Sequence, residues 1–254
     1  MKDETIPSSA PSLKKDVLFY GIAVIAERFV SFLIIPILTK NLSQEFYGVW
    51  TQIIVTVGLL SPVVLMGFSS AAVRFLAGEK DSQKISSIFH WMSAIVLSIS
   101  FLVIVIALLF GSTLSKVIFG NTHLYRFVYL FGFFLLADVS FELILSFLRA
   151  QKKIQTLSVY YFLKNAGRVI VLALGILLFH LNFLYTVTSL VALQLGLIIF
   201  MYVKDIFSKL GFNFYLKKVP WKKIICFSLP LVPSLFQSGE IILRTVILSC
   251  ISSI

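Results

Sequence analysis

Seven long apolar runs, separated by short polar segments, set the pattern of this 254-residue sequence. Each run is long enough to cross the ~30 Å hydrocarbon layer of a bilayer as an α-helix. An open sheet could not satisfy its backbone groups in lipid, and the sequence lacks the alternating segments of roughly ten residues that a membrane barrel needs. We therefore predict seven transmembrane helices, at Val17–Leu38, Phe46–Phe68, Ile88–Phe110, Leu124–Leu148, Leu157–Phe179, Leu184–Val203 and Ile224–Ile254.

The same pattern divides the chain into four expected parts. Residues 1–16 are polar, and we expect a disordered cytoplasmic N-terminus there. Residues 17–203 are expected to form a six-helix N-terminal lobe. Residues 204–223 mix lysines with Phe, Tyr and Trp, which is typical of an interfacial linker on an anionic inner leaflet. Because the sequence stops inside the seventh run, we expect residues 224–254 to be the first helix of a second lobe. The predicted fold class is thus an all-α polytopic membrane bundle, truncated in its second lobe.

Composition and charge placement agree with a membrane protein. The chain is 59% hydrophobic and 13% charged, against about 25% charged in an average soluble domain. Its net charge of +11 comes from residues at the ends of the apolar runs, which favours membrane orientation over nucleic-acid binding. Nearly all Lys and Arg outside the runs fall on the side of the N-terminus, leaving Lys40, Lys116 and Arg126 opposite. We therefore expect a bacterial cytoplasmic-membrane protein with a cytoplasmic N-terminus.

Ionisable residues inside the runs are the candidate functional groups, because charge at membrane depth is costly. Asp138 and Glu142 share one helix face, and Lys164 and Arg168 share a face of the next helix. Depth along antiparallel helices predicts two ion pairs, Asp138 with Arg168 and Glu142 with Lys164. Three roles are open for these groups on the sequence alone: structural ion pairs, the lining of a water-filled central cavity, or proton carriers.

Four further charges belong to the same set of candidates. Arg28 lies roughly 17 Å deep, where it would bind an anionic head group or pair with a carboxylate of another helix. Its neighbour Glu27 points about 100° away and pairs with it poorly. Glu240 and Arg244 are four residues apart and can satisfy each other. With Glu27, Glu240 and Arg244 as further ion-pair or proton-coupling candidates, the expected substrate-binding cations are Arg28, Lys164 and Arg168.

Catalytic and metal chemistry lack a matching pattern in the sequence. His90, His123 and His180 fall near predicted helix ends without clustering, so we interpret them as interfacial and not as ligands. Nucleophile triads, metal-ligand spacings and phosphate loops are absent from the sequence. We therefore predict no catalytic residue, no metal and no cofactor, and a protein that is not an enzyme.

Two stretches and a shorter third one carry a more specific signal. Residues Ile35–Trp50 read IPILTKNLSQEFYGVW, and Gly67–Asp81 read GFSSAAVRFLAGEKD. Both resemble the oligosaccharide and polysaccharide flippase family, in which the first helix ends in P-x-L-T-[RK]-x-L-S-x-x-x-Y-G and the second closes with G-x-[ST]-[ST]-A-x-x-R-[FY]. The run FSLPLVPS at Phe227–Ser234 resembles the start of the seventh helix of that family.

The resemblance implies a fold and a function. Members of the family have two six-helix lobes around a central, often basic cavity. They are thought to move undecaprenyl-diphosphate-linked oligosaccharides from the inner to the outer leaflet for surface polysaccharide biosynthesis. The expected partners are then a lipid-linked glycan, membrane lipids, and a glycan polymerase or glycosyltransferases of the same pathway, with no nucleic acid.

Other functions remain alternatives to that reading. The nearest is a drug or ion antiporter of the same superfamily. A membrane glycan polymerase or ligase is less favoured because the expected outer segments are short and hold one carboxylate, Glu45. An inactive fragment or a scaffold is the third alternative.

Overall fold

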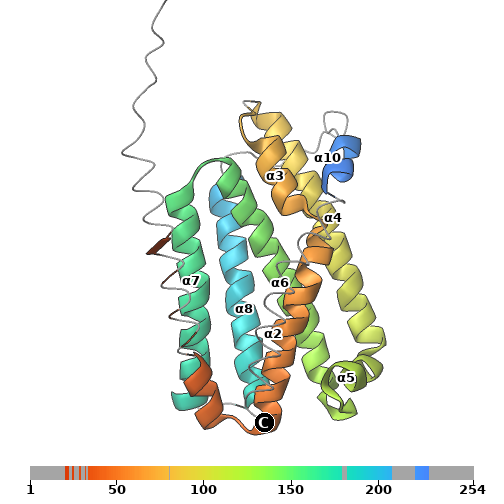
Figure 1. The fold of residues 1–254 in the computed structure, drawn as a ribbon, viewed down its shortest axis with the longest axis vertical. Coiled ribbons are helices and arrows are strands. Elements are labelled where there is room, and N and C mark those ends of the chain that lie inside the picture. The colour runs from red at the N-terminus through yellow and green to blue at the C-terminus, as the bar shows by residue number, and fades with distance from the viewer. Residues whose placement is uncertain are drawn as a thin grey trace, which may run out of the picture.

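The structure is a computed structural model that describes residues 21, 22, 25, 29, 32, 34–79, 81–178, 182–207 and 221–228. This part of the chain is entirely helical apart from turns and short connections (Figure 1). Residues 34–41 are helical. The elements that follow are α2 (Gln44–Leu65), α3 (Phe68–Leu76), α4 (Ser82–Leu109), α5 (Gly111–Phe119), η1 (Thr122–Leu124), α6 (Tyr125–Ala150), α7 (Ile154–Ala173), η2 (Leu174–Leu178), α8 (Phe183–Met201), η3 (Tyr202–Phe207) and α10 (Trp221–Ser228).

Five helical segments are long and apolar enough to cross a membrane, and they match the second to sixth predicted runs. They are Gln44–Leu65, Ser82–Leu109, Thr122–Ala150, Ile154–Ile176 and Phe183–Phe207. The all-α polytopic membrane bundle predicted from the sequence is therefore confirmed. The N-terminal segment 1–16, most of the first and seventh runs, and the linker between residues 207 and 221 lie outside the described residues.

Helix α6 is the centre of the bundle. It packs against α2, α3, α4, α5, α7 and α8, and 61% of its apolar stretch is buried, against 28 to 39% in the other four spans. Three fully buried phenylalanines, Phe134, Phe141 and Phe147, fill its surroundings. A helix surrounded by others must be apolar on all sides, so any charge on α6 needs a partner from a neighbouring helix.

The second predicted run is broken near its inner end. We expected one helix over Phe46–Phe68, but α2 ends at Leu65, and Met66 and Gly67 adopt the left-handed conformation at φ 47° and 72°. Pro62 precedes the break by one turn and removes one backbone donor from the helix. Chain direction changes here, and α3 starts at Phe68.

Two further boundaries differ from the prediction for local reasons. Helix α4 starts at Ser82, six residues before the apolar run, because the Asp81 carboxylate caps it by accepting from the Gln83 amide at 2.9 Å. The segment between the third and fourth predicted spans contains helix α5 and the start of the 3₁₀ turn η1. Gly111 lets α5 pack closely, since a Cβ there would lie 2.7 Å from Tyr129.

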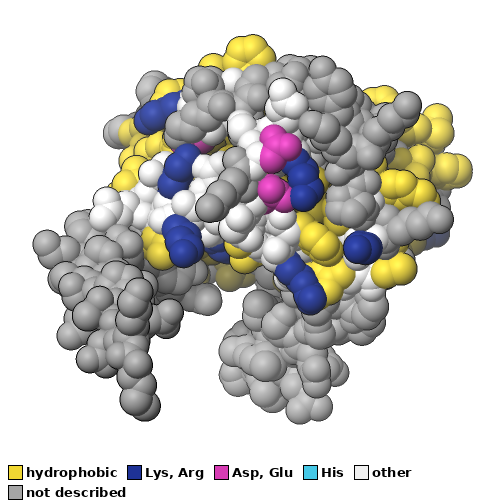
Figure 2. Space-filling view, turned by 90° about the horizontal axis from the view of Figure 1, so that it is seen from above, with side chains coloured by type: hydrophobic (Ala, Val, Ile, Leu, Met, Phe, Trp, Pro, Cys, Tyr) yellow, Lys and Arg dark blue, Asp and Glu magenta, His cyan; other side chains and the backbone are white. Residues whose placement is uncertain are grey.

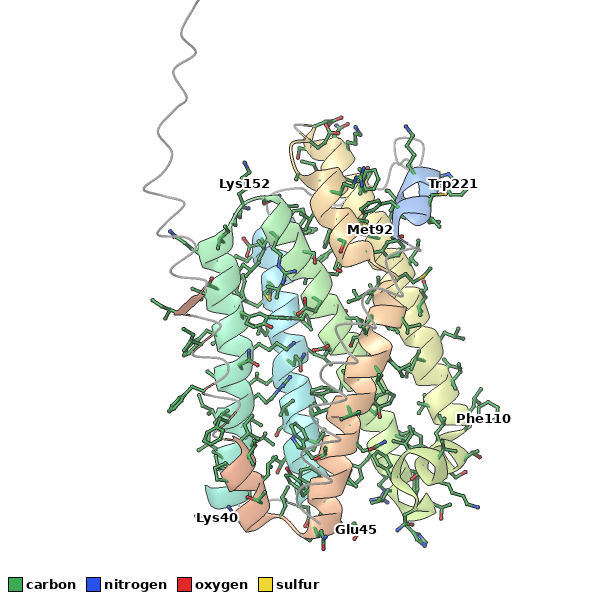
Figure 3. The ribbon with its side chains drawn as sticks, in the orientation of Figure 1. Lys40, Glu45, Met92, Phe110, Lys152 and Trp221 are labelled. Carbon is green, nitrogen blue, oxygen red and sulfur yellow. The ribbon has the colours of Figure 1, made fainter. Side chains whose placement is uncertain are left out.

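The two ends of the bundle differ in charge. Lys152 and Trp221 lie at one end, and Lys40 and Glu45 lie at the other (Figure 3). Lysine and arginine side chains spread over the first end (Figure 2). The described basic residues of this end are Arg74, Lys84, Arg149, Lys152, Lys153, Lys204 and Lys223. At the other end they are Lys40, Lys116 and Arg126.

The packing of α10 against the α2–α3 break leads to a prediction about stability. A Cβ on Gly67 would lie 2.5 Å from the Ser228 carbonyl oxygen, whereas Gly78, also left-handed at φ 86°, has open space around it. We expect Gly67→Ala to cost about 2–3 kcal/mol and Gly78→Ala about 1 kcal/mol, because only the first adds a clash to the backbone cost. Unfolding of the purified full chain in detergent measures both, and equal losses would contradict this seat for α10.

Candidate functional site

A carboxylate in the middle of α6 joins three helices. Asp138 accepts a hydrogen bond from the Lys164 ammonium of α7, with Nζ 2.8 Å from Oδ1. Its second oxygen accepts from the Ser61 hydroxyl of α2 at 3.1 Å. The Lys164 and Asp138 side chains are 10% and 20% exposed. Charge-assisted hydrogen bonds are strongest in such low-dielectric surroundings.

The antiparallel arrangement of α6 and α7 brings these groups to one depth. Asp138 lies about 18 Å from the inner end of α6, and Lys164 lies about 15 Å from the start of α7, at 1.5 Å per residue. The short turn at 151–153 allows this, with Lys152 in the left-handed conformation at φ 58°. The charged cluster therefore sits near the midplane of a ~30 Å hydrocarbon layer.

Aromatic rings of α6 support both cations of α7. Lys164 Nζ lies 4.4 Å from the centre of the Phe141 ring. The Arg168 guanidinium carbon lies 5.6 Å from the centre of the Phe134 ring. A ring face attracts a cation, and the attraction grows when water is excluded. Helix α6 thus supplies a carboxylate and two ring faces to the same pair of cations.

The ion pairs predicted from depth alone are wrong in register. Lys164 pairs with Asp138 and not with Glu142, and Glu142 lies 3.8 Å from Arg149 of its own helix. The error comes from the helix ends. Helix α7 starts three residues before the predicted run, which deepens Lys164 by about 4.5 Å and leaves it midway in depth between Glu142 and Asp138, so depth does not decide its partner. Arg168 also acts electrostatically on the Asp138 carboxylate.

The other charged candidates lie outside the described residues. These are Glu27, Arg28, Glu240 and Arg244. Their roles stay predictions.

A second polar group at the basic end of the bundle was missed in the sequence. His90 is buried between helices, which the sequence did not indicate. Its Nε2 lies 2.9 Å from the Tyr202 hydroxyl, and its Nδ1 lies 2.7 Å from the Ser86 carbonyl oxygen. Tyr160 donates to the buried Asp205 carboxylate at 2.7 Å. Tyr202 and Asp205 both belong to the π-helix η3, a wide turn that a hydropathy pattern does not reveal.

A small cavity beside the charged cluster adds one more residue. Lys164 and Arg168 line it from α7, and Gln194 lines it from α8, with Leu190, Leu193 and Leu197 around them. Gln194 sits in an apolar run, and a single amide there gives no signal in the sequence. Among the described residues, no group of three or more His, Cys, Asp or Glu could hold a metal ion.

Comparison with known proteins places the chain in a family. A family model described as polysaccharide biosynthesis protein matches residues 13–247. The chain belongs to this family. The match confirms the resemblance drawn from residues 35–50, which lead into α2, and from residues 67–81, which contain α3. Family membership and the five spans make it a multi-pass membrane protein of polysaccharide biosynthesis. No curated protein and no solved structure matches the chain.

The central pair predicts an asymmetric response to mutation. Asp138→Asn leaves two cations without their carboxylate, and we expect a loss of about 3–5 kcal/mol. Lys164→Met should cost less, because Arg168 still acts on Asp138. The double variant should recover part of the loss. Detergent-based unfolding of the full chain measures all three.

The pair of Glu142 with Arg149 is the matched control. It is longer, at 3.8 Å, and its side chains are 28% and 39% exposed. Arg149→Gln should cost less than about 1 kcal/mol, as is usual for exposed ion pairs. A loss for Asp138→Asn no greater than this would contradict a buried central pair.

Proposed function

We propose that this protein takes part in moving a lipid-linked, diphosphate-bearing oligosaccharide from the inner to the outer leaflet. The observation that carries the proposal is the charged cluster at the bundle centre, where the cations Lys164 and Arg168 of α7 lie beside Asp138 of α6. A cationic cluster at membrane depth suits an anionic cargo. Membership in a polysaccharide biosynthesis family supports a glycan as the rest of that cargo.

Transport of such a cargo needs binding and exchange without covalent chemistry. The diphosphate needs cationic donors when it leaves water, whereas the lipid tail can remain in the bilayer. The Asp138 carboxylate balances one cation while no cargo is bound, which lowers the cost of an empty site. Alternating access to this cluster from the two leaflets would complete the cycle, with residues 17–203 as one lobe and residues 224–254 as the start of another.

The remaining expectations belong to the same proposal. The basic end with Lys152 and Lys153 faces the cytoplasm of a bacterial cell, because positive residues stay on that side. Arg28 joins Lys164 and Arg168 at the cargo. The protein is a transporter and not an enzyme, uses no cofactor, and works beside a glycan polymerase or glycosyltransferases of its pathway.

Restoration of surface polysaccharide tests the proposal. The full chain is expressed in cells that lack the flippase of such a pathway, and surface glycan is measured together with the amount of the protein in the membrane. We expect Arg168→Gln to lower the restored glycan by about 10-fold or more, because a charge-assisted contact with the cargo is lost. Arg168→Lys should retain a larger share.

Arg126→Gln is the matched control. Arg126 is an exposed cation at the far end of the bundle, near the Tyr125 ring, and its loss should leave surface glycan unchanged. An unaltered level with Arg168→Gln would contradict a role of this cation in transport. If the unmutated chain left the glycan missing but lowered the accumulation of a drug, the antiporter alternative would replace the proposal.

A further inference from the structure

Gln194 is a buried polar group in a position where burial has a cost. Its side chain is 3% exposed within α8. Among the described residues, its amide nitrogen has no hydrogen-bond partner. An amide buried without a partner costs roughly 1–3 kcal/mol. A leucine would fill the same position in this apolar helix without that cost.

The surroundings of the Gln194 amide indicate which ligand it could bind. Gln194 shares its cavity with Lys164 and Arg168, the two cations of the charged cluster. The cavity measures about 10 Å³ for the centre of a water-sized sphere, which is room for roughly one water or one oxygen atom. The rest of its lining is leucine. A lysine, an arginine and a glutamine therefore line a space that admits one atom.

These three groups share one chemical preference. Lysine and arginine are donors without acceptors, and the amide nitrogen of glutamine is a donor. A single oxygen of a phosphate or diphosphate accepts from several donors at once. Two cations favour such a charged oxygen over the neutral hydroxyl of a sugar. Replacement of such a donor leaves a polar oxygen unpaired, which is how buried polar groups give specificity.

We propose that Gln194 is a substrate-contacting residue that donates, together with Lys164 and Arg168, to one anionic oxygen of the cargo diphosphate. This inference rests on the proposed function and names a contact that recognises the head group. It accounts for an unpaired buried amide as a donor kept for the cargo, at a cost in stability to the empty protein.

Binding to the full chain, purified in detergent, tests the inference. Isothermal titration calorimetry uses two probes, geranyl diphosphate as a prenyl-linked diphosphate and inorganic pyrophosphate as a free anion. We expect Gln194→Leu to weaken the binding of both probes by about 10-fold or more, since one hydrogen bond to a charged group is lost. Gln194→Glu should weaken binding further, because a carboxylate repels the anion and pairs with the two cations.

Thermal unfolding of the same variants separates this contact from a structural role. Gln194→Leu should unfold at the same or a higher temperature, because it removes an unpaired buried amide. Thr186→Val is the matched control. The Thr186 hydroxyl of α8 is likewise buried, has no hydrogen-bond partner in the described part of the chain, and does not line this cavity. Thr186→Val should match Gln194→Leu in stability and the unmutated chain in binding.

Each remaining outcome decides between the two proposals. Destabilisation by Gln194→Leu would show that the amide has a structural partner, and this would overturn the inference. Unchanged binding by Gln194→Leu, with binding lost in Arg168→Gln, would overturn it and leave the proposed function standing. Binding of pyrophosphate without geranyl diphosphate would assign the cavity to a free anion. Failure of the unmutated chain to bind either probe would overturn both proposals.

Discussion

The bundle depends on how one buried carboxylate is satisfied. Asp138 lies near the membrane midplane on the most enclosed helix, where an unpaired charge would cost several kcal/mol. Lys164 of α7 donates a hydrogen bond to one of its oxygens, and Ser61 of α2 donates to the other. The helices α2, α6 and α7 must therefore keep one relative height and rotation. In lipid, where apolar surfaces gain little from contact with each other, such a polar tie fixes the packing that hydrophobicity alone leaves open.

The two ends of the bundle are held by contacts of a different kind from those of the charged cluster at its centre. At the basic end, η3 ties two neighbours through Tyr202 to His90 and through Asp205 to Tyr160. Rings close the opposite end, where Phe46 and Phe127 pack on Phe183 with centroids 5.5 and 5.7 Å away. These layers of ordinary packing and hydrogen bonding enclose the charged cluster. A binding site needs such surroundings, because its side chains keep their geometry only when the neighbouring parts of the fold are fixed.

Hydropathy and charge were sufficient to predict the spans, because lipid imposes a length and a composition on each helix. They were insufficient for features that depend on one residue in its three-dimensional surroundings. The break at Met66–Gly67 arises from left-handed backbone inside an apolar run. The partner of Lys164 does not follow from depth, because Lys164 lies midway in depth between Glu142 and Asp138. Gln194 stands alone among apolar neighbours, so its position beside two cations follows only from the packing of α8 against α7.

The Asp138 carboxylate beside Lys164 and Arg168 affects how the proposed cargo binds. If Asp138 were absent, Lys164 would lie in the membrane without its carboxylate, and the desolvation cost of that ammonium would favour any anion available. The cargo competes with Asp138 for the Lys164 ammonium, whereas the Gln194 amide nitrogen has no described partner to give up. Moderate binding of this kind suits transport, since a carrier must release its cargo as readily as it takes it up.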